Sequence, residues 1–257
     1  MLWLFDVSNN FLSGSIPSQI SNQNELFALL LSHNNFTGSI PVQISSMPQL
    51  RFLDLSKNHL TGIVPSHIGN LTELGYLDIN TNHLEGELPT TISYLENLQV
   101  LSLSGNKFTG IIANVDTEQL PVVKEAKDGS SLGESSPFCN LTFLKSLDLS
   151  NNQLSGDLPG FFWNMKALRS LDLSRNAFFG EVPTSSYYSS SLMSLHLSNN
   201  NFTGCFPPAF KNFKSLIVLD VRNNKISGEI PFWIGESNSL LRILQLRSNM
   251  FSGSIPW

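Results

Sequence analysis

A pattern of 24 residues recurs along nearly the whole chain, and it restricts the possible folds more than any other feature. Residues 50–73 (LRFLDLSKNHLTGIVPSHIGNLTE) carry leucines, an asparagine, a glycine and a proline at positions that the next 24 residues repeat. A fixed period of this length predicts a solenoid, in which each turn packs only against its neighbours. The copies open at Leu2, Leu26, Leu50, Leu74, Leu98, Leu144, Leu168, Leu192, Leu216 and Leu241.

Each copy begins with a short alternation of apolar and polar residues, such as Leu53-Asp54-Leu55, which is typical of a strand. Ten such strands predict one parallel sheet on the inner, concave face of the solenoid. The asparagine after each strand, Asn58 in this copy, can both donate and accept, so a column of asparagines is expected to satisfy backbone groups of the turns. A proline recurs in nearly every copy, as Pro65 does, so the convex face should contain 3₁₀ turns and extended segments instead of long helices.

One irregular segment interrupts the pattern. The copy that opens at Leu98 loses its proline after Gly110, and the pattern returns only at Asn140, which implies about 22 inserted residues. We expect one domain of about ten turns over residues 1–257, made of a first block (1–112), a charged, irregular insert (113–138) and a second block (139–257).

The repeat L-x-x-L-x-L-S-x-N-x-L-T-G-x-V-P-x-x-I-x-x-L-x-x resembles the plant-specific class of leucine-rich repeat, which is distinguished by the S/T-G-x-I/L/V-P element seen at residues 13–17. The resemblance implies a horseshoe-shaped or superhelical solenoid. Arrays of this class form the ectodomains of plant receptor-like kinases and receptor-like proteins. These ectodomains bind a peptide or protein ligand without catalysing a reaction, and they pair with a leucine-rich-repeat co-receptor.

The resemblance also leaves alternatives open. Similar repeats form polygalacturonase-inhibiting proteins, so a secreted inhibitor of a cell-wall-degrading enzyme is the second candidate function. In receptors of this class an insert such as 113–138 can fold onto the concave face and help to bind the ligand. A mobile surface loop or a decayed repeat is the other interpretation of that segment.

The resemblance implies an extracellular or plasma-membrane protein of signalling or defence. The repeat pattern already includes Leu2, so we see no secretion signal, and no apolar run reaches the ~20 residues that span a bilayer. Receptors of this class usually carry cysteine-containing caps at the ends of the array. Neither cap is recognisable here, and we expect an array that is uncapped at both ends.

The candidate ligand-binding residues flank the strand leucines on the inner face, where side chains point to solvent. One column of these residues is mostly acidic, and another is bulky and apolar before the insert but small after it. An apolar strip of Leu30, Phe52, Tyr76 and Val100 with an acidic edge would suit an extended peptide or a protein surface. The alternative is that aspartate is common here for structural reasons. The candidates are Leu30, Phe52, Asp54, Tyr76, Asp78, Val100, Asp148, Asp172 and His196.

Enzyme activity is not expected. Asp54 and Asp78 should lie ~5 Å apart, near the spacing of a retaining glycosidase pair, but a solvated surface gives no reason for their pKa values to diverge. The five histidines occupy unrelated repeat positions, and no cofactor or metal motif is present. A net charge of −5 argues against binding to nucleic acid.

Four N-x-T sequons predict glycosylation at Asn35, Asn70, Asn140 and Asn201. Asn70 and Asn140 are the stronger candidates because we expect them on the convex side. The two cysteines, Cys139 and Cys205, lie about three turns apart, or ~14 Å, which exceeds the ~7 Å limit between the Cα atoms of a disulfide. Two free thiols are therefore expected.

Overall fold

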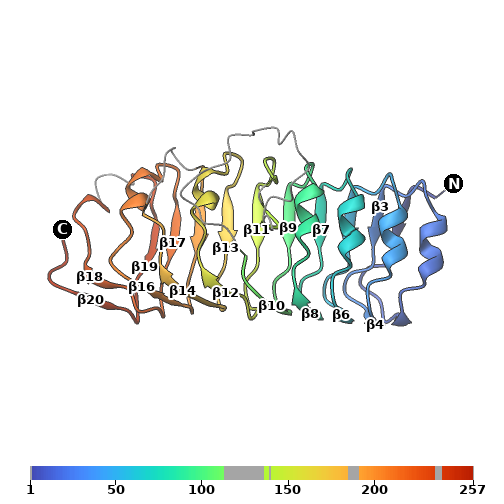
Figure 1. Cartoon of the computed structure of the whole chain (residues 1–257), viewed down its shortest axis with the longest axis horizontal. Coiled ribbons are helices and arrows are strands. Elements are labelled where there is room, and N and C mark those ends of the chain that lie inside the picture. The colour runs from blue at the N-terminus through green and yellow to red at the C-terminus, as the bar shows by residue number, and fades with distance from the viewer. Residues whose placement is uncertain (1, 113–135, 139, 185–190, 235–238, 257) are drawn as a thin grey trace, which may run out of the picture.

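The structure, a computed structural model, describes residues 2–112, 136–138, 140–184, 191–234 and 239–256. Ten short strands, one from each repeat, lie side by side in one parallel sheet, which we call the main sheet (Figure 1). The predicted solenoid with a ten-stranded parallel sheet is confirmed. The strands are β1 (Leu4–Asp6), β3 (Ala28–Leu30), β5 (Phe52–Asp54), β7 (Tyr76–Asp78), β9 (Val100–Ser102), β11 (Ser146–Asp148), β13 (Ser170–Asp172), β15 (Ser194–His196), β17 (Val218–Asp220) and β19 (Ile243–Gln245).

The repeated leucines form one continuous core along the solenoid. The central residue of each strand, such as Leu53 in β5, points inward and is buried, while its two neighbours point outward. This alternation follows from the two-residue period of a strand. The core therefore holds the outward-pointing residues of the main sheet in a fixed register.

The predicted asparagine column is present and joins neighbouring turns. Asn82 donates from Nδ2 to the carbonyl oxygens of Leu55 at 3.0 Å and Ile79 at 3.1 Å. Its Oδ1 accepts the backbone N–H of Leu60 at 3.0 Å. One side chain thus satisfies backbone groups of two successive turns that no strand partner reaches.

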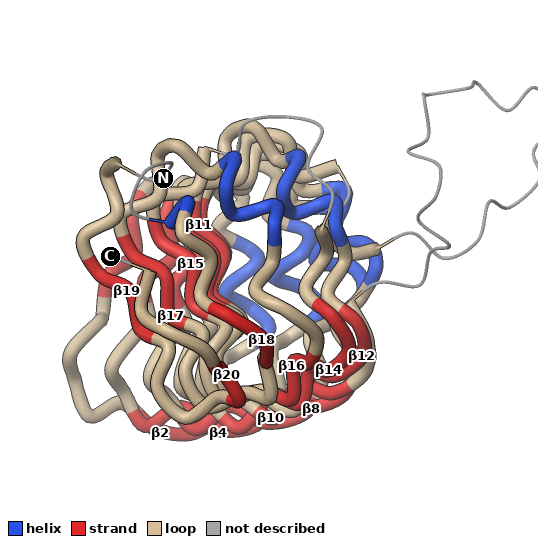
Figure 2. The backbone as a smooth tube through the Cα atoms, turned by 90° about the vertical axis from the view of Figure 1, so that its left-hand side faces the viewer, coloured by secondary structure: helices blue, strands red, loops and turns tan. Residues whose placement is uncertain are grey.

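In the described part of the chain, six short 3₁₀ helices lie on the side of the solenoid opposite the main sheet, as expected from the recurring prolines (Figure 2). Each one begins directly after a proline, whose fixed φ suits the entry into the helix. The helices are η1 (Ser18–Asn22), η2 (Val42–Ser46), η3 (Ser66–Asn70), η4 (Thr90–Tyr94), η5 (Gly160–Asn164) and η6 (Pro208–Asn212).

The extended segments after the asparagines also pair with one another, which we did not predict from the sequence. They form three smaller parallel sheets along one edge of the solenoid, seen at the bottom of Figure 2. The first contains β2 (Ser13–Ser15), β4 (Asn35–Gly38), β6 (His59–Gly62), β8 (His83–Glu87) and β10 (Lys107–Thr109). The others contain β12 (Ser155–Asp157), β14 (Ala177–Glu181) and β16 (Asn201–Thr203), and β18 (Ser227–Glu229) with β20 (Met250–Ser252).

The main sheet continues directly across the insert. Val100 of β9 pairs with Ser146 of β11, and Asn152 of the asparagine column donates to the carbonyl of Leu103 at 3.1 Å. Of the predicted insert, residues 113–135 lie outside the described residues. The two sides of that gap meet, because the Ser136 hydroxyl donates to the carbonyl of Ile112 at 2.8 Å.

This contact predicts that residues 113–135 can be replaced by a short Gly/Ser linker without loss of the fold. We expect the free energy of unfolding to rise by roughly 1 kcal/mol, because a shorter loop costs less entropy to close. Chemical denaturation followed by circular dichroism measures the change. A decrease of more than about 2 kcal/mol would contradict the prediction and would mean that the segment packs against the array.

Candidate ligand-binding site

The candidate residues occupy the solvent-facing side of the main sheet, which is the inner face of the solenoid, in two neighbouring columns. Parallel pairing aligns Phe52 with Tyr76, and Asp54 with Asp78. Tyr76 is in turn aligned with Val100. The same columns continue beyond the insert, where Asp148 pairs with Asp172 and Asp172 with His196.

Four aromatic side chains form a row across the first strands of the main sheet, and we call this set the aromatic row. It consists of Trp3, Phe27, Phe52 and Tyr76. The ring centroids are 5.1 Å apart between Trp3 and Phe27, 5.3 Å between Phe27 and Phe52, and 6.1 Å between Phe52 and Tyr76. Trp3 is 68% exposed and Phe52 is 41% exposed, so large parts of the row face solvent.

The aromatic row differs from the apolar strip that we predicted. Leu30 does not lie in line with Phe52, because it pairs with Asp54 and belongs to the acidic column. The residue aligned with Phe52 is Ala28, which is buried, and the ring of the preceding residue, Phe27, packs against Phe52 instead. Val100 follows Tyr76 as expected and is half-buried.

Trp3 and Phe27 were missed because we considered only the residues that flank the strand leucines. Both occupy the position directly before a strand, where the next two repeats carry Arg51 and Gly75. Arg51 lies over the ring of Phe27, with its Cζ 5.7 Å from the ring centroid, and forms an ion pair with Glu73 at 3.0 Å. Comparison of this third column along the repeats would have identified the row.

The aspartates of the acidic column have a structural role. Asp54 accepts the backbone N–H of Ser56 at 3.0 Å through Oδ1, which closes a turn at the end of the strand. Asp78, Asp148 and Asp172 accept the N–H two residues ahead in the same way. This geometry supports the structural explanation for aspartate at this position, and it uses one oxygen of each carboxylate.

The pair Tyr76 and Asp78 is the most electrostatically distinct part of this face. The Tyr76 hydroxyl lies 3.2 Å from Asp78 Oδ2 and donates to it. Burial raises the pKa of the Asp78 carboxyl above its usual range, and the Asp54 charge adds to this effect. Burial and then these two carboxylates raise the pKa of Tyr76 to about 12, so the phenol stays neutral. The expectation that a solvated surface leaves the pKa of Asp78 unshifted is therefore wrong, because sequence spacing does not reveal this partial burial.

His196 lies in a separate polar cluster on β15 and β17. Its Nε2 lies 2.9 Å from the Ser194 hydroxyl, and its Nδ1 lies 3.9 Å from Asp220 Oδ2. The second distance is too long for a hydrogen bond. The Asp220 carboxylate is instead bound by Arg222, at 3.1 Å from Nε and 3.0 Å from Nη2. We interpret the cluster as an ion-pair network and not as a Ser-His-Asp catalytic arrangement.

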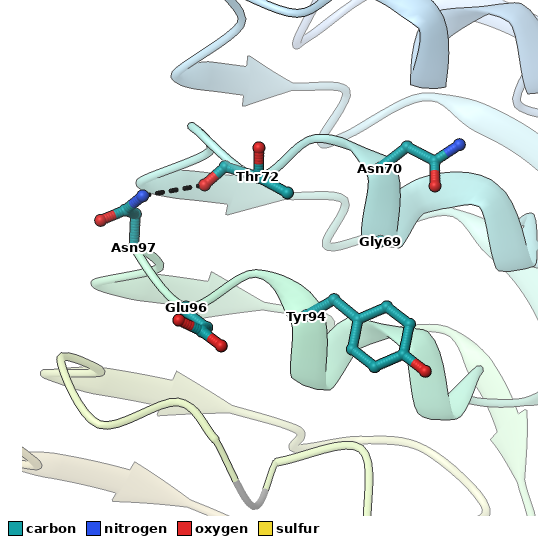
Figure 3. A pocket seen from close by; sticks show the side chains of 6 residues that line it. All are labelled: Gly69, Asn70, Thr72, Tyr94, Glu96 and Asn97. Atoms are coloured by element: carbon teal, nitrogen blue, oxygen red, sulfur yellow. Dashed lines mark hydrogen bonds between the residues drawn. The ribbon is translucent and has the colours of Figure 1, made fainter. Parts of the chain in front are cut away.

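The sequon asparagines are all exposed, and two of them lie in the smaller sheets. Asn70 ends helix η3 on the convex side, beside a shallow pocket that also includes Thr72, Tyr94 and Asn97 (Figure 3). Asn97 donates from Nδ2 to the backbone carbonyl of Thr72 at 2.9 Å. Glycosylation of Asn35, Asn70, Asn140 and Asn201 remains a prediction.

Three further features of the described part of the chain concern its thiols, metal ligands and membrane helices. Cys205 is an exposed free thiol, and Cys139 lies outside the described residues. No group of three histidine, cysteine, aspartate or glutamate side chains in this part is arranged to hold a metal ion. Within the same residues, none of the helices has the length and apolar character needed to cross a membrane.

Models of the leucine-rich repeat match residues 1–23, 25–47, 48–108, 134–178 and 190–251. The chain belongs to the leucine-rich repeat family. No curated protein matches the sequence. Solved structures that resemble the array include the plant peptide hormone receptor RGFR1 in complex with RGF2, which is 32% identical over 99% of the array with a TM-score of 0.85.

Two further solved structures resemble this leucine-rich repeat array. The Arabidopsis receptor kinase HAESA, solved with the peptide hormone IDA and the co-receptor SERK1, is 31% identical over 99% of the array with a TM-score of 0.85. A plant ice-binding protein is 29% identical over 98% of it with a TM-score of 0.81. The array covers 37% of the RGFR1 chain, 39% of the HAESA chain and 74% of the ice-binding chain, so it spans less than half of the two receptors.

Proposed function

We propose that this array recognises a peptide or protein ligand as part of a plant receptor-like kinase or receptor-like protein. Its likeness to RGFR1 and HAESA, both solved with peptide ligands, supports this proposal. An extracellular location and pairing with a leucine-rich-repeat co-receptor such as SERK1 belong to the same proposal. The array itself has no catalytic part in this function, which consists of binding.

The observation that carries the proposal is the exposed aromatic row on the main sheet. Tryptophan and tyrosine are enriched among the residues that dominate binding energy at protein interfaces. Each ring of the row packs against the next at 5.1–6.1 Å, so its position is set before a ligand arrives. Less side-chain entropy is then lost on binding. We place Phe52 and Tyr76 at the centre of the site, with Val100 and the acidic column at its edges.

Replacing both Phe52 and Tyr76 with alanine tests this function. We expect binding of linear peptides selected on the wild-type array from a random library to weaken roughly 30- to 100-fold, which corresponds to about 2–3 kcal/mol. Titration calorimetry or fluorescence anisotropy measures the dissociation constants. The fold should be retained, because both side chains lie on the surface of the sheet and the core leucines are unchanged.

The matched control replaces two aromatic side chains elsewhere on the surface. Tyr94, which is 59% exposed, lies on helix η4, and Phe179, which is 50% exposed, lies on β14 of a smaller sheet. The double variant Tyr94→Ala and Phe179→Ala should bind the selected peptides as the wild type does. If both double variants bind with wild-type affinity, the aromatic row is not the binding site.

A further inference from the structure

We propose that the ligand supplies a basic side chain, an arginine or a lysine, which binds between Asp54 and Asp78 next to the rings of Phe52 and Tyr76. This inference rests on the proposed function, because it names the chemistry of the ligand for the same site. It commits to a linear peptide in which a basic residue lies next to an apolar residue. The apolar residue would pack on the aromatic row.

The first observation concerns the carboxylate oxygens of Asp54 and Asp78, which no basic side chain of the described residues binds. Asp54 Oδ1 accepts two hydrogen bonds from Ser56, at 3.0 Å from N and 2.7 Å from Oγ, while no described residue donates to Oδ2. Asp78 Oδ2 accepts the Tyr76 hydroxyl, and the Ser102 hydroxyl also donates to this carboxylate, so its described side-chain donors on this face are neutral. No lysine, arginine or histidine in the described part of the chain lies within 4.0 Å of either carboxylate. Two neighbouring carboxylates thus share this face without a basic partner.

The second observation is that the same column shows what such a carboxylate binds when a cation is available. Asp220 occupies the equivalent position in β17, and its Oδ1 accepts the N–H of Arg222 at 3.1 Å in the same turn. Its Oδ2 is bound by the Arg222 guanidinium at 3.0–3.1 Å. At Asp54 and Asp78, the residues that correspond to Arg222 are Ser56 and Asn80, which are neutral. The ligand would therefore supply the charge that Arg222 supplies at Asp220.

The third observation concerns the aromatic rings beside the two carboxylates. The face of an aromatic ring attracts cations, and the effect grows where water is partly excluded. The aromatic row already contains one such contact, between the Arg51 guanidinium and the Phe27 ring at 5.7 Å. Arg51 is held there by Glu73 and does not reach Asp54 or Asp78. Phe52, Tyr76 and the two carboxylates thus offer a second cation both a ring face and a negative charge.

The test begins with linear peptides selected on the wild-type array from a random library. For a selected peptide, each arginine is replaced by citrulline and each lysine by norleucine, which removes the charge while keeping most of the shape. Each peptide pair is then titrated against the wild type and against the double variant Asp54→Asn and Asp78→Asn. Asparagine retains an oxygen for the N–H of residues 56 and 80, so circular dichroism should show an unchanged fold.

The matched control is the double variant Asp157→Asn and Glu181→Gln. It also removes two negative charges, but from β12 and β14 of a smaller sheet, away from the aromatic row. We expect neutralisation of one basic residue of the peptide to weaken binding about tenfold for the wild type and for this control. The same change should have little effect on binding to Asp54→Asn and Asp78→Asn. That non-additivity would identify the contact.

Two results would overturn the inference, and they have different meanings. In the first, the selected peptides need Phe52 and Tyr76 for binding but contain no basic residue that binding requires, or neutralising that residue weakens binding equally for every variant. The inference of a basic ligand side chain is then wrong, and the proposed function stands. If the selected linear peptides bind independently of Phe52 and Tyr76, the aromatic row is not the binding site, and both the inference and the proposed peptide recognition at this surface fail.

Discussion

Replacing Asn82 with alanine should destabilise the array by roughly 3–5 kcal/mol, one of the largest losses expected for any single side chain. Its amide joins four backbone groups: Nδ2 donates to three carbonyls and Oδ1 accepts the N–H of Leu60. Asn82 is 4% exposed, so water cannot replace these bonds without local opening. Each buried group left without a partner costs about 1–3 kcal/mol. Urea denaturation followed by circular dichroism measures the loss.

Asn10 provides the matched control at the same repeat position. Its Nδ2 donates to the carbonyls of Val7 and Ser8, but the residue is exposed and the structure gives its Oδ1 no backbone donor among the described residues. Asn10→Ala should therefore cost less than about 1 kcal/mol. Equal losses for Asn82→Ala and Asn10→Ala would mean that the asparagine column does not hold the turns together.

The fold was predictable because the same physical requirement recurs in every repeat. A leucine in the strand, an asparagine after it and a proline before the 3₁₀ helix each have one structural role, and ten copies make the pattern unmistakable. Leu53, Asn58 and Pro65 occupy the places that the pattern predicts. The smaller sheets were missed because the segments that form them are short and most of them contain glycine, which weakens a strand.

The candidate site was less predictable, since binding residues are the ones that the repeat leaves free to vary. Phe52, Tyr76 and Asp78 were identified because they flank strand leucines. Trp3 and Phe27 lie before their strands, and only the packing of the rings shows that they extend the row. The raised pKa of Asp78 depends on partial burial, which sequence spacing alone does not reveal.

The second block also packs differently from the first on the convex side, which we did not predict from the sequence. Helices η2, η3 and η4 bury Ile44, Ile68 and Ile92, whereas η5 and η6 bury Phe162 and Phe210 at the equivalent position. Aromatic side chains fill more volume and pack edge to face, so fewer substitutions fit the same space. The stability of the second block should therefore depend strongly on single aromatic residues.

Replacing Trp163 with alanine tests this dependence and should cost about 3–5 kcal/mol. Trp163 is 1% exposed and packs edge to face against Phe213, with ring centroids 5.3 Å apart. Its Nε1 donates to the carbonyl of Pro183 in the next repeat at 3.2 Å, so the side chain joins two turns. Because each turn of a solenoid is stabilised mainly by its neighbours, loss of this contact weakens the whole second block.

A conservative variant separates the ring of Trp163 from its hydrogen bond, and a second variant provides the control at an exposed aromatic residue. Trp163→Phe retains an aromatic ring but removes the hydrogen bond to Pro183, so it should cost roughly 1–2 kcal/mol, well below the loss for alanine. Phe143→Ala removes an aromatic side chain that is 60% exposed and should cost less than about 1 kcal/mol. Urea denaturation followed by circular dichroism is the suitable measurement, because replacing Trp163 alters the tryptophan fluorescence directly. If Trp163→Ala costs no more than Phe143→Ala, the aromatic packing of the convex side does not determine the stability of the second block.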